Sequence, residues 1–186
     1  MTLIIGLGHK ARQGKDTFAG GVLDYFAEVQ LARGKHGGYY TKVSVQRIGF
    51  ADALYDMARN EYGMTTKDAP LLQRLGSKMR ETDEQYWIKR AFAKIQPTTN
   101  IAIITDVRYK NEAEYVHSEG GYLVDITRLN LDGSRYIADD RPANHPSEID
   151  LDGYNFDFYL TNSHGHEALL KEQAITLVEY LRGLHS

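Results

Sequence analysis

Cysteine is absent from this chain of 186 residues, and tryptophan occurs only once. Without cysteine we expect no disulfide scaffold, no thiol nucleophile and no cysteine-based zinc site. No stretch approaches the roughly 18 uninterrupted apolar residues that a membrane span needs. The N-terminus also lacks the pattern of a secretory signal. We therefore expect a cytoplasmic protein with no membrane partner.

A strong charge of one sign is missing as well. The formal net charge is −3 at pH 7 and the sequence pI is about 6.2, whereas a general nucleic-acid-binding surface is normally basic. We therefore expect no nucleic-acid partner. A composition of 42% hydrophobic and 25% charged residues is ordinary for a globular protein. The length suits one domain over residues 1–186, and monomer and homodimer are both open.

Short apolar stretches alternate with longer helical patterns along the chain, which is typical of βαβ units and a parallel sheet. Five strands are expected, of which the third is a continuous apolar run typical of a central strand. The predicted strands cover about residues 2–7, 43–50, 101–105, 122–127 and 156–160. The predicted helices cover about residues 15–32, 51–96 (broken near 63–70), 111–118 and 167–184.

The most informative stretch covers residues 3–17, LIIGLGHKARQGKDT. A short apolar run leads through a basic turn with glycines into an amphipathic helical pattern, which is the context of a phosphate-binding loop. Backbone N–H groups of such a loop and of the first helical turn point at one spot, where the helix dipole favours an anion. Lys15 adds a charge that can reach the β- and γ-phosphates of a nucleotide. The sequence therefore predicts binding of a nucleoside triphosphate.

The loop departs from the pattern G-x-x-x-x-G-K-[ST] at two positions. His9 stands where the first glycine is expected, and Asp16 stands where a serine or threonine usually binds magnesium. The ending Gly-Lys-Asp-Thr is similar to that of nucleoside monophosphate kinases, which hold Mg²⁺ largely through water. The expected ATP-binding residues are Lys10, Ala11, Arg12, Gln13, Gly14, Lys15, Asp16, Thr17 and Asn162.

Ligands of open α/β sheets bind beyond the carboxyl ends of the strands. Asp106 and Arg108 follow the predicted third strand. Asp106 can accept hydrogen bonds from magnesium-bound water, or it can cap the next turn. Arg108 can bind a phosphate or pair with Asp106. Asp52, after the second strand, can accept hydrogen bonds from a sugar hydroxyl or a base.

The helical pattern over residues 71–80 has an apolar face with basic residues at its border. Such basic residues are most often a solvated face. Arg74 is nevertheless expected to bind the phosphate of an acceptor, because its helix is expected to flank the same cleft as Arg108. Trp87 is either a core residue or a residue that stacks on a ligand.

Residues 129–155 show no periodic pattern and are rich in Asp, Asn, Pro, Gly and Arg. A long irregular insertion in a compact domain is usually functional. Phosphoryl transfer needs positive charge near the transferred group and exclusion of water, and an arginine-bearing flap supplies both. We therefore expect a lid at about 129–150 with Arg135 and Arg141, a solvated surface loop being the alternative. His145 has no partner at metal-ligand spacing, so no zinc site is expected.

Several motifs occur in order along nearly the whole chain: KARQGKDT from residue 10, FADAL from 50, LQRLG from 72, TDVRYKNEA from 105 and HPSE from 145. This series resembles the deoxynucleoside monophosphate (dNMP) kinases of bacteriophages. The Asp-Val-Arg-x-x-Asn-Glu and His-Pro-Ser-Glu elements are the most specific. The chain departs from the family pattern at His9, which is usually glycine, and at Gln13, which is commonly serine.

The resemblance implies an adenylate-kinase-like fold. This is a P-loop NTPase fold with three α/β/α layers, a helical monophosphate-binding part at about 51–96 and a lid. It also implies ATP-dependent, Mg²⁺-assisted phosphorylation of dNMPs for DNA precursor synthesis, in the host cytoplasm if the protein is phage-encoded. The implied catalytic residues are Arg12, Lys15, Asp106, Arg108 and Arg128. The implied substrate-binding residues are Asp52, Arg74, Trp87, Arg108 and Glu148, and the implied magnesium residues, mostly acting through water, are Asp16, Thr17 and Asp106.

Two other functions are open from the sequence. One is a different P-loop kinase, acting on dephospho-coenzyme A or phosphomevalonate, and the other is a non-catalytic nucleotide-binding module. A binding module needs neither an arginine-rich lid nor a second pocket of acceptor size, so the sequence favours a kinase. It separates the acceptors poorly.

Overall fold

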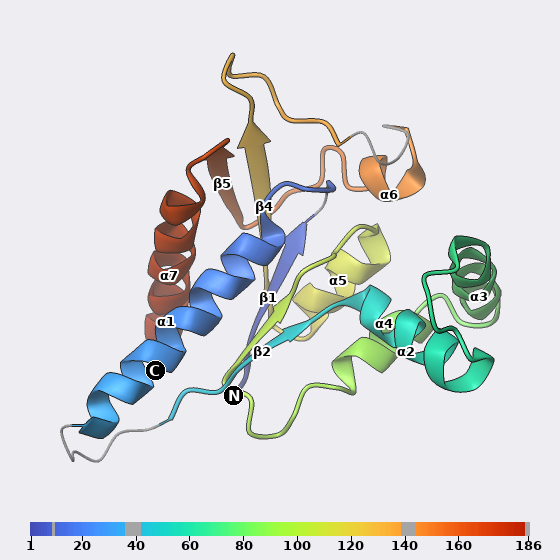
Figure 1. Cartoon of the computed structure of the whole chain (residues 1–186), viewed down its shortest axis with the longest axis horizontal. Coiled ribbons are helices and arrows are strands. Elements are labelled where there is room, and N and C mark those ends of the chain that lie inside the picture. The colour runs from blue at the N-terminus through green and yellow to red at the C-terminus, as the bar shows by residue number, and fades with distance from the viewer. Residues whose placement is uncertain (9, 36–41, 139–143, 185–186) are drawn as a thin grey trace.

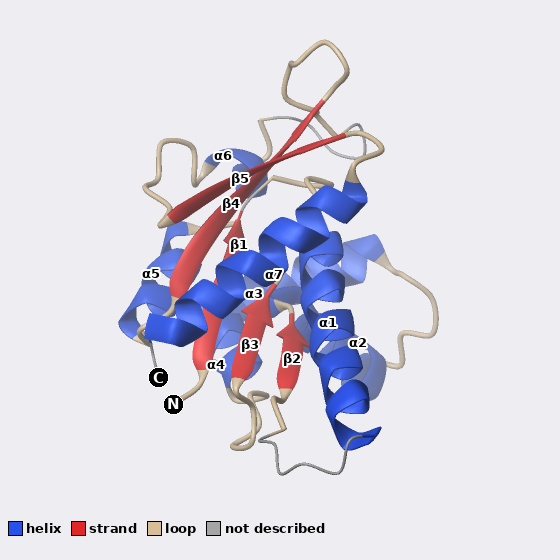
Figure 2. Ribbon diagram, turned by 90° about the vertical axis from the view of Figure 1, so that its left-hand side faces the viewer, coloured by secondary structure: helices blue, strands red, loops and turns tan. Residues whose placement is uncertain are grey.

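The computed structural model describes residues 1–8, 10–35, 42–138 and 144–184. Its five strands form one sheet in the order β2-β3-β1-β4-β5, with every neighbouring pair parallel (Figure 2). The prediction of an α/β fold with a five-stranded parallel sheet is confirmed. The strands are β1 (Leu3–Gly8), β2 (Val45–Ile48), β3 (Ile101–Ile104), β4 (Tyr122–Leu129) and β5 (Phe158–Ser163).

Helices cover both faces of this sheet and give the three layers that were expected (Figure 1). On one face lie α1 (Lys15–Lys35) and α7 (Glu167–Leu184), packed against each other. On the other face lie α2 (Phe50–Tyr62), α4 (Tyr86–Phe92) and α5 (Lys110–Ser118). A further helix, α3 (Ala69–Thr82), packs on α2 and α4, and the short α6 (Pro146–Ile149) follows the segment after β4.

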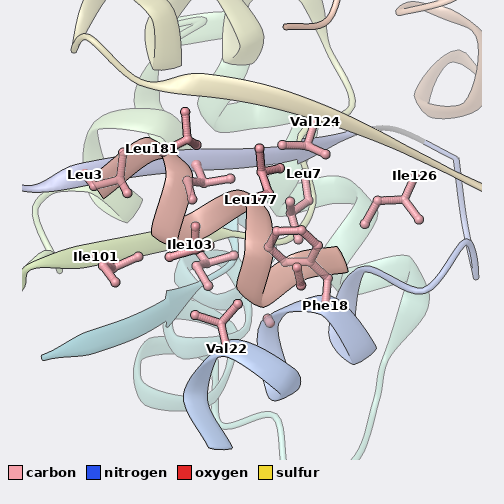
Figure 3. Packing of buried hydrophobic residues seen from close by; sticks show 14 of the residues in the cluster. Leu3, Leu7, Phe18, Val22, Ile101, Ile103, Val124, Ile126, Leu177 and Leu181 are labelled. Carbon is pink, nitrogen blue, oxygen red and sulfur yellow. The ribbon is translucent and has the colours of Figure 1, made fainter. Parts of the chain in front are cut away.

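The central strand β1 is buried on both faces because its side chains alternate between the two helical layers. Leu3, Ile5 and Leu7 face α1 and α7, where Leu7 lies beside Phe18 (Figure 3), whereas Ile4 belongs to the core on the opposite face. Burial on both faces explains the unbroken apolar run that the sequence shows here. Each fully buried large side chain of this kind contributes about 1.5–3 kcal/mol, so the start of the phosphate loop rises from a rigid support.

The helices α2, α3 and α4 have small cores of their own, apart from the two sheet cores. Between α2 and α3 the chain turns at Gly63, whose φ of 66° lies in the left-handed region, close to the predicted helix break. Trp87 is 2% exposed, and its indole N–H donates to the carbonyl oxygen of Gly76 at 3.2 Å. Trp87 is therefore a core residue that joins α4 to α3, and no surface remains for the substrate contact expected of it.

The end of the chain departs in detail from the prediction. The last strand, β5, begins two residues later than expected, and β4 continues to Leu129, where the irregular insertion was expected to begin. That insertion also contains α6, which has no periodic signal because it is only four residues long. Among the described residues, no helix has the length and apolar character that crossing a membrane requires.

Candidate functional site

A cleft of about 370 Å³ opens beyond the carboxyl ends of β1, β2 and β3. The chain visits β2 and β3 on one side of β1 and then β4 and β5 on the other, so the loop after β1 lies at the topological switch point of the sheet. This is where open α/β sheets bind ligands. The cleft is lined by Arg12, Gln13, Gly14, Lys15, Asp16, Thr17, Arg47, Ala51, Asp52, Thr105, Asp106, Arg108 and Arg128.

The predicted phosphate loop forms the wall of this cleft and runs directly into α1, which begins at Lys15. Gly14 has a φ of 108°, and a Cβ atom there would lie 2.7 Å from Cδ2 of Leu170. Arg12 is also in the left-handed region, with a φ of 55°. The chain therefore turns sharply just before a helix N-terminus, as a phosphate loop requires.

Gln13 is buried inside the loop and ties it to the end of β4 and to the chain that follows. Its side-chain oxygen accepts a hydrogen bond of 2.7 Å from the backbone N–H of Arg128. Its amide nitrogen donates to the carbonyl oxygens of Tyr136, at 2.9 Å, and of Ala11, at 3.1 Å. The Gln13 side chain is thus a structural cross-link. Only the backbone of Gln13 remains for the ATP contact that was expected of this residue.

Lys15 is a buried cation at the head of α1, with 7% of its surface exposed. Burial lowers the pKa of Lys15 to about 8; Arg108 adds to this lowering, whereas Glu148, Asp106 and Asp16 oppose it. The ammonium group donates to the carbonyl oxygen of Lys10. A buried cation beside a second cation is stabilised by a bound anion, so the electrostatics of the cleft favour a phosphate.

Asp106 connects the end of β3 to the start of α2. Its two carboxylate oxygens accept hydrogen bonds from the backbone N–H groups of Phe50, at 2.7 Å, and Ala51, at 3.0 Å. Burial raises the pKa of Asp106, while these two hydrogen bonds and Arg108 oppose the rise. Asp106 therefore caps a helix, though it is α2 and not the next turn along the chain, and it also lines the cleft.

Arg47 lines the cleft and was not identified from the sequence. Its guanidinium lies 3.1 Å from Asp16 Oδ1 and 3.5 Å from Asp52 Oδ2. Asp52 in turn accepts a hydrogen bond of 2.8 Å from the N–H of Gly49 at the start of α2. The strand-end rule missed Arg47 because this residue lies inside β2 and not after it. Arg47 is the next-to-last residue of β2, and this position is the sequence feature by which it could have been identified.

Of the three arginines expected near the transferred phosphoryl group in or beside the lid, only Arg128, at the end of β4, lines the cleft among the described residues. Arg128 lines the cleft, its guanidinium lies 4.6 Å from the centre of the Tyr136 ring, and it contacts His164. Arg135 lies outside the cleft lining, 3.5 Å from the carboxylate of Asp125. Arg141 lies outside the described residues, as does His9.

Four residues expected to bind ATP or substrate do not line the cleft. Lys10 donates to the carbonyl oxygen of Glu148 and to Asp152. Glu148 is 6% exposed and its carboxylate receives Arg108 and the N–H of Ala11. Asn162 is 5% exposed, beneath Gly14. Arg74 lies on the exposed side of α3 and does not line the cleft, because the apolar face of α3 packs on α2 and α4.

Magnesium is the metal whose chemistry suits this cleft. Asp16, Thr17 and Asp106 all line it and offer hard oxygen donors. Within the described part of the chain, no three His, Asp or Glu side chains are grouped to hold a metal by themselves. Mg²⁺ commonly keeps several waters and shares the phosphates of a nucleotide. The residues present therefore fit a magnesium ion that would be held mostly through water, together with a bound nucleotide.

Comparison with known proteins gives one local sequence match. No model of a protein family matches the chain. Over 62 residues, which are 33% of this chain and 28% of the relative, it is 37% identical to a protein of Acanthamoeba polyphaga mimivirus described as "Putative deoxynucleotide monophosphate kinase". The match therefore spans less than a third of that relative.

Two solved structures of similar length align along almost the whole chain. The APS kinase of Mycobacterium tuberculosis, in complex with AMPPNP and APS, has 11% identity and a TM-score of 0.47, with 97% of this chain and 98% of that chain covered. A sugar kinase from Janibacter sp. has 16% identity and a TM-score of 0.40, with 96% and 95% covered. All three proteins are described as kinases, and the strand order of this chain establishes its fold without them.

Proposed function

We propose that the chain is a kinase that transfers the γ-phosphoryl group of ATP to deoxynucleoside 5′-monophosphates. The observation that carries the proposal is the charge of the cleft: five cationic and three acidic side chains line it, and the cation at its head, Lys15, is buried. Positioning and electrostatic stabilisation account for almost all catalysis of phosphoryl transfer. The sequence motifs and the match to the mimivirus protein support a dNMP as the acceptor.

The residues divide the work as follows. The loop N–H groups and Lys15 hold the β- and γ-phosphates, and Arg108 approaches the transferred group from the end of β3. Arg128 and Tyr136 offer a flat stacked surface that can support the base of ATP. Magnesium, when bound with the nucleotide, would neutralise phosphate charge. Asp16 and Asp106 would orient its water ligands.

A coupled assay of ADP release tests the proposal. The acceptor panel contains the dNMPs, the corresponding ribonucleotides, dephospho-coenzyme A and phosphomevalonate. We expect ADP release with at least one dNMP. Release only with dephospho-coenzyme A or phosphomevalonate would replace the acceptor but keep the kinase, whereas ATP binding without ADP release for any acceptor would make the chain a binding module.

Paired arginine variants test the acceptor side. Arg108→Ala should raise the KM for dNMP far more than the KM for ATP, and should lower kcat because a misplaced acceptor loses near-attack geometry. Arg74→Ala should leave the dNMP KM within about twofold, the size of an ordinary surface substitution, because Arg74 lies outside the cleft. A large rise in the dNMP KM of Arg74→Ala would return this residue to the acceptor site.

A further inference from the structure

The short helix α6 lies directly against the first half of the phosphate loop, although the loop and α6 are far apart in the sequence. Nζ of Lys10 donates to the carbonyl oxygen of Glu148 at 2.7 Å and to Oδ1 of Asp152 at 2.6 Å. The backbone N–H of Ala11 donates to Oε2 of Glu148 at 2.9 Å, across 137 residues of sequence. Glu148 thus contacts the loop through both its backbone and its side chain.

The other carboxylate oxygen of Glu148 holds Arg108. Oε1 of Glu148 lies 2.7 Å from the Arg108 guanidinium, and the two side chains are 8% and 20% exposed. A charge-assisted hydrogen bond at this distance is among the stronger contacts in a protein. The removal of one partner leaves the other as an uncompensated buried charge. The carboxylate of Glu148 therefore links the phosphate loop, at Ala11, to the guanidinium of Arg108.

Arg108 is also fixed at its backbone. Glu112, in the first turn of α5, accepts hydrogen bonds from the N–H groups of Arg108, at 2.8 Å, and Tyr109, at 3.1 Å. The base of the Arg108 side chain therefore has a set position, and rotation about its side-chain bonds is the remaining freedom. Glu148 holds the guanidinium at the far end of this side chain.

We propose that Glu148 is a positioning residue that holds the Arg108 guanidinium in register with the phosphate loop, and not a ligand of the substrate. Both oxygens of its carboxylate are used by Ala11 and Arg108, and Glu148 is not part of the cleft lining. The role given to Arg108 rests on the proposed function. The contact geometry of Glu148 does not.

A double-mutant cycle tests this role. The variants are Glu148→Gln, which keeps the volume and an oxygen acceptor for Ala11, Arg108→Gln, and both together. We expect each single substitution to lower kcat/KM for the dNMP about a hundredfold, the size expected when a reacting group is misplaced by about 1 Å. The double variant should be little worse than either single variant, because the two residues act as one unit.

Asp152→Asn is the matched control, since Asp152 joins the same segment to Lys10 but does not hold Arg108 in the contacts described. It should leave kcat/KM within about threefold, as expected for a half-exposed ion pair. Glu148→Gln should also split the kinetic constants as loss of the Arg108 guanidinium does, with a KM for the dNMP raised far more than the KM for ATP.

The outcomes separate this inference from the proposed function. Additive losses in the cycle, or losses that Asp152→Asn reproduces, would overturn the positioning role while the wild type remains a dNMP kinase. A wild type that phosphorylates no dNMP would overturn the proposed function. The same cycle is then measured on the free energy of unfolding, where additive losses would again reject the coupling of Glu148 and Arg108.

Discussion

Asp106 and Phe50 are joined by a hydrogen bond of 2.7 Å although they are 56 residues apart in the sequence. Phe50 is the first residue of α2, and its N–H is the donor. The acceptor, Asp106, lies two residues beyond the end of β3. Asp106 therefore has a capping role, and the same carboxylate lines the cleft, where its catalytic role stays a prediction. One face of it secures α2 and the cleft lies beside it.

Asp106→Asn should affect both stability and activity. An amide presents one acceptor oxygen where the carboxylate presents two, so one of the N–H groups of α2 loses its partner. We expect the free energy of unfolding to fall by about 1–2 kcal/mol, the usual cost of a lost helix cap, and the turnover of the folded protein to fall at least tenfold. Denaturant unfolding and steady-state kinetics on one preparation measure both. A stability loss with unchanged turnover would leave Asp106 a cap only.

Lys15 should make activity sensitive to alkaline pH. Its charged form is the one that stabilises the phosphates, and burial lowers the pKa of Lys15 to about 8. We expect kcat/KM for ATP to fall about tenfold per pH unit above this value, because kcat/KM reports the ionisation of the free enzyme. Lys15→Ala should lower turnover by about two to four orders of magnitude. The loss of one preorganised donor usually lowers turnover by about two to three orders of magnitude, so the upper end of this range exceeds that loss. A flat profile to pH 10, or near wild-type turnover in Lys15→Ala, would contradict the assignment of the loop.

Burial of the Lys15 charge should lower the stability of the folded protein at neutral pH. The pKa of Lys15 is about 8 in the folded protein, whereas an ordinary lysine, as in the unfolded chain, has a pKa of 10.5. The unfolded state therefore binds more protons between these values, and the protein becomes more stable as pH rises through them. Lys15→Met removes the buried charge, and we expect a higher Tm than wild type at pH 7. This advantage should shrink towards pH 10.5. A lower Tm for Lys15→Met at pH 7 would show that its carboxylate neighbours outweigh its burial.

The sheet could be predicted from the sequence because β1 and β3 are buried on both faces and appear as continuous apolar runs. Four residues that follow the first three strands could be found as well, because chain order alone places them at one edge of the sheet. They are Lys15, Asp52, Asp106 and Arg108. All four line the cleft.

The remaining parts of the site depend on contacts that have no local signal. Gln13 meets Arg128 across 115 residues, and Glu148 meets Ala11 across 137. Their residue types suggested ligand binding, but packing gives their side chains to the protein itself. For Arg74, the sequence could predict that it lies beside the apolar face of a helix. It could not predict whether that side of the helix is turned towards the cleft, because this depends on how α3 packs on α2 and α4.

Gln13→Ala should loosen the link between the loop and the end of β4. It leaves the N–H of Arg128 and the carbonyl oxygen of Tyr136 without their side-chain partner. A fully buried group left in this way costs about 1–3 kcal/mol, and these half-buried groups cost less. We expect a large fall in the unfolding free energy and a raised KM for ATP. Gln30→Ala, which removes one hydrogen bond to Val43 remote from the cleft, is the control and should lose only about 1 kcal/mol. Equal losses in the two variants would refute the cross-link.

Arg47 should compete with magnesium for Asp16. The guanidinium lies 3.1 Å from Asp16 Oδ1, and the two side chains are 41% and 83% exposed. An exposed pair of this kind contributes about 0–1 kcal/mol, so magnesium-bound water can replace it at little cost. Arg47→Gln releases the carboxylate, and we expect the Mg²⁺ concentration for half-maximal activity to fall several-fold at fixed ATP.

The control for this prediction is Arg59→Gln, which removes an equal charge from the far part of α2, where Arg59 lies over the Tyr55 ring. A change in net charge alone would move the Mg²⁺ requirement of both variants equally. Asp16→Asn should raise that requirement, and Arg47→Gln should have no further effect in the Asp16→Asn background, because the carboxylate for which guanidinium and metal compete is then gone. If Arg47→Gln still lowers the requirement there, Arg47 acts on magnesium through Asp52 or the phosphates, and the competition at Asp16 is wrong.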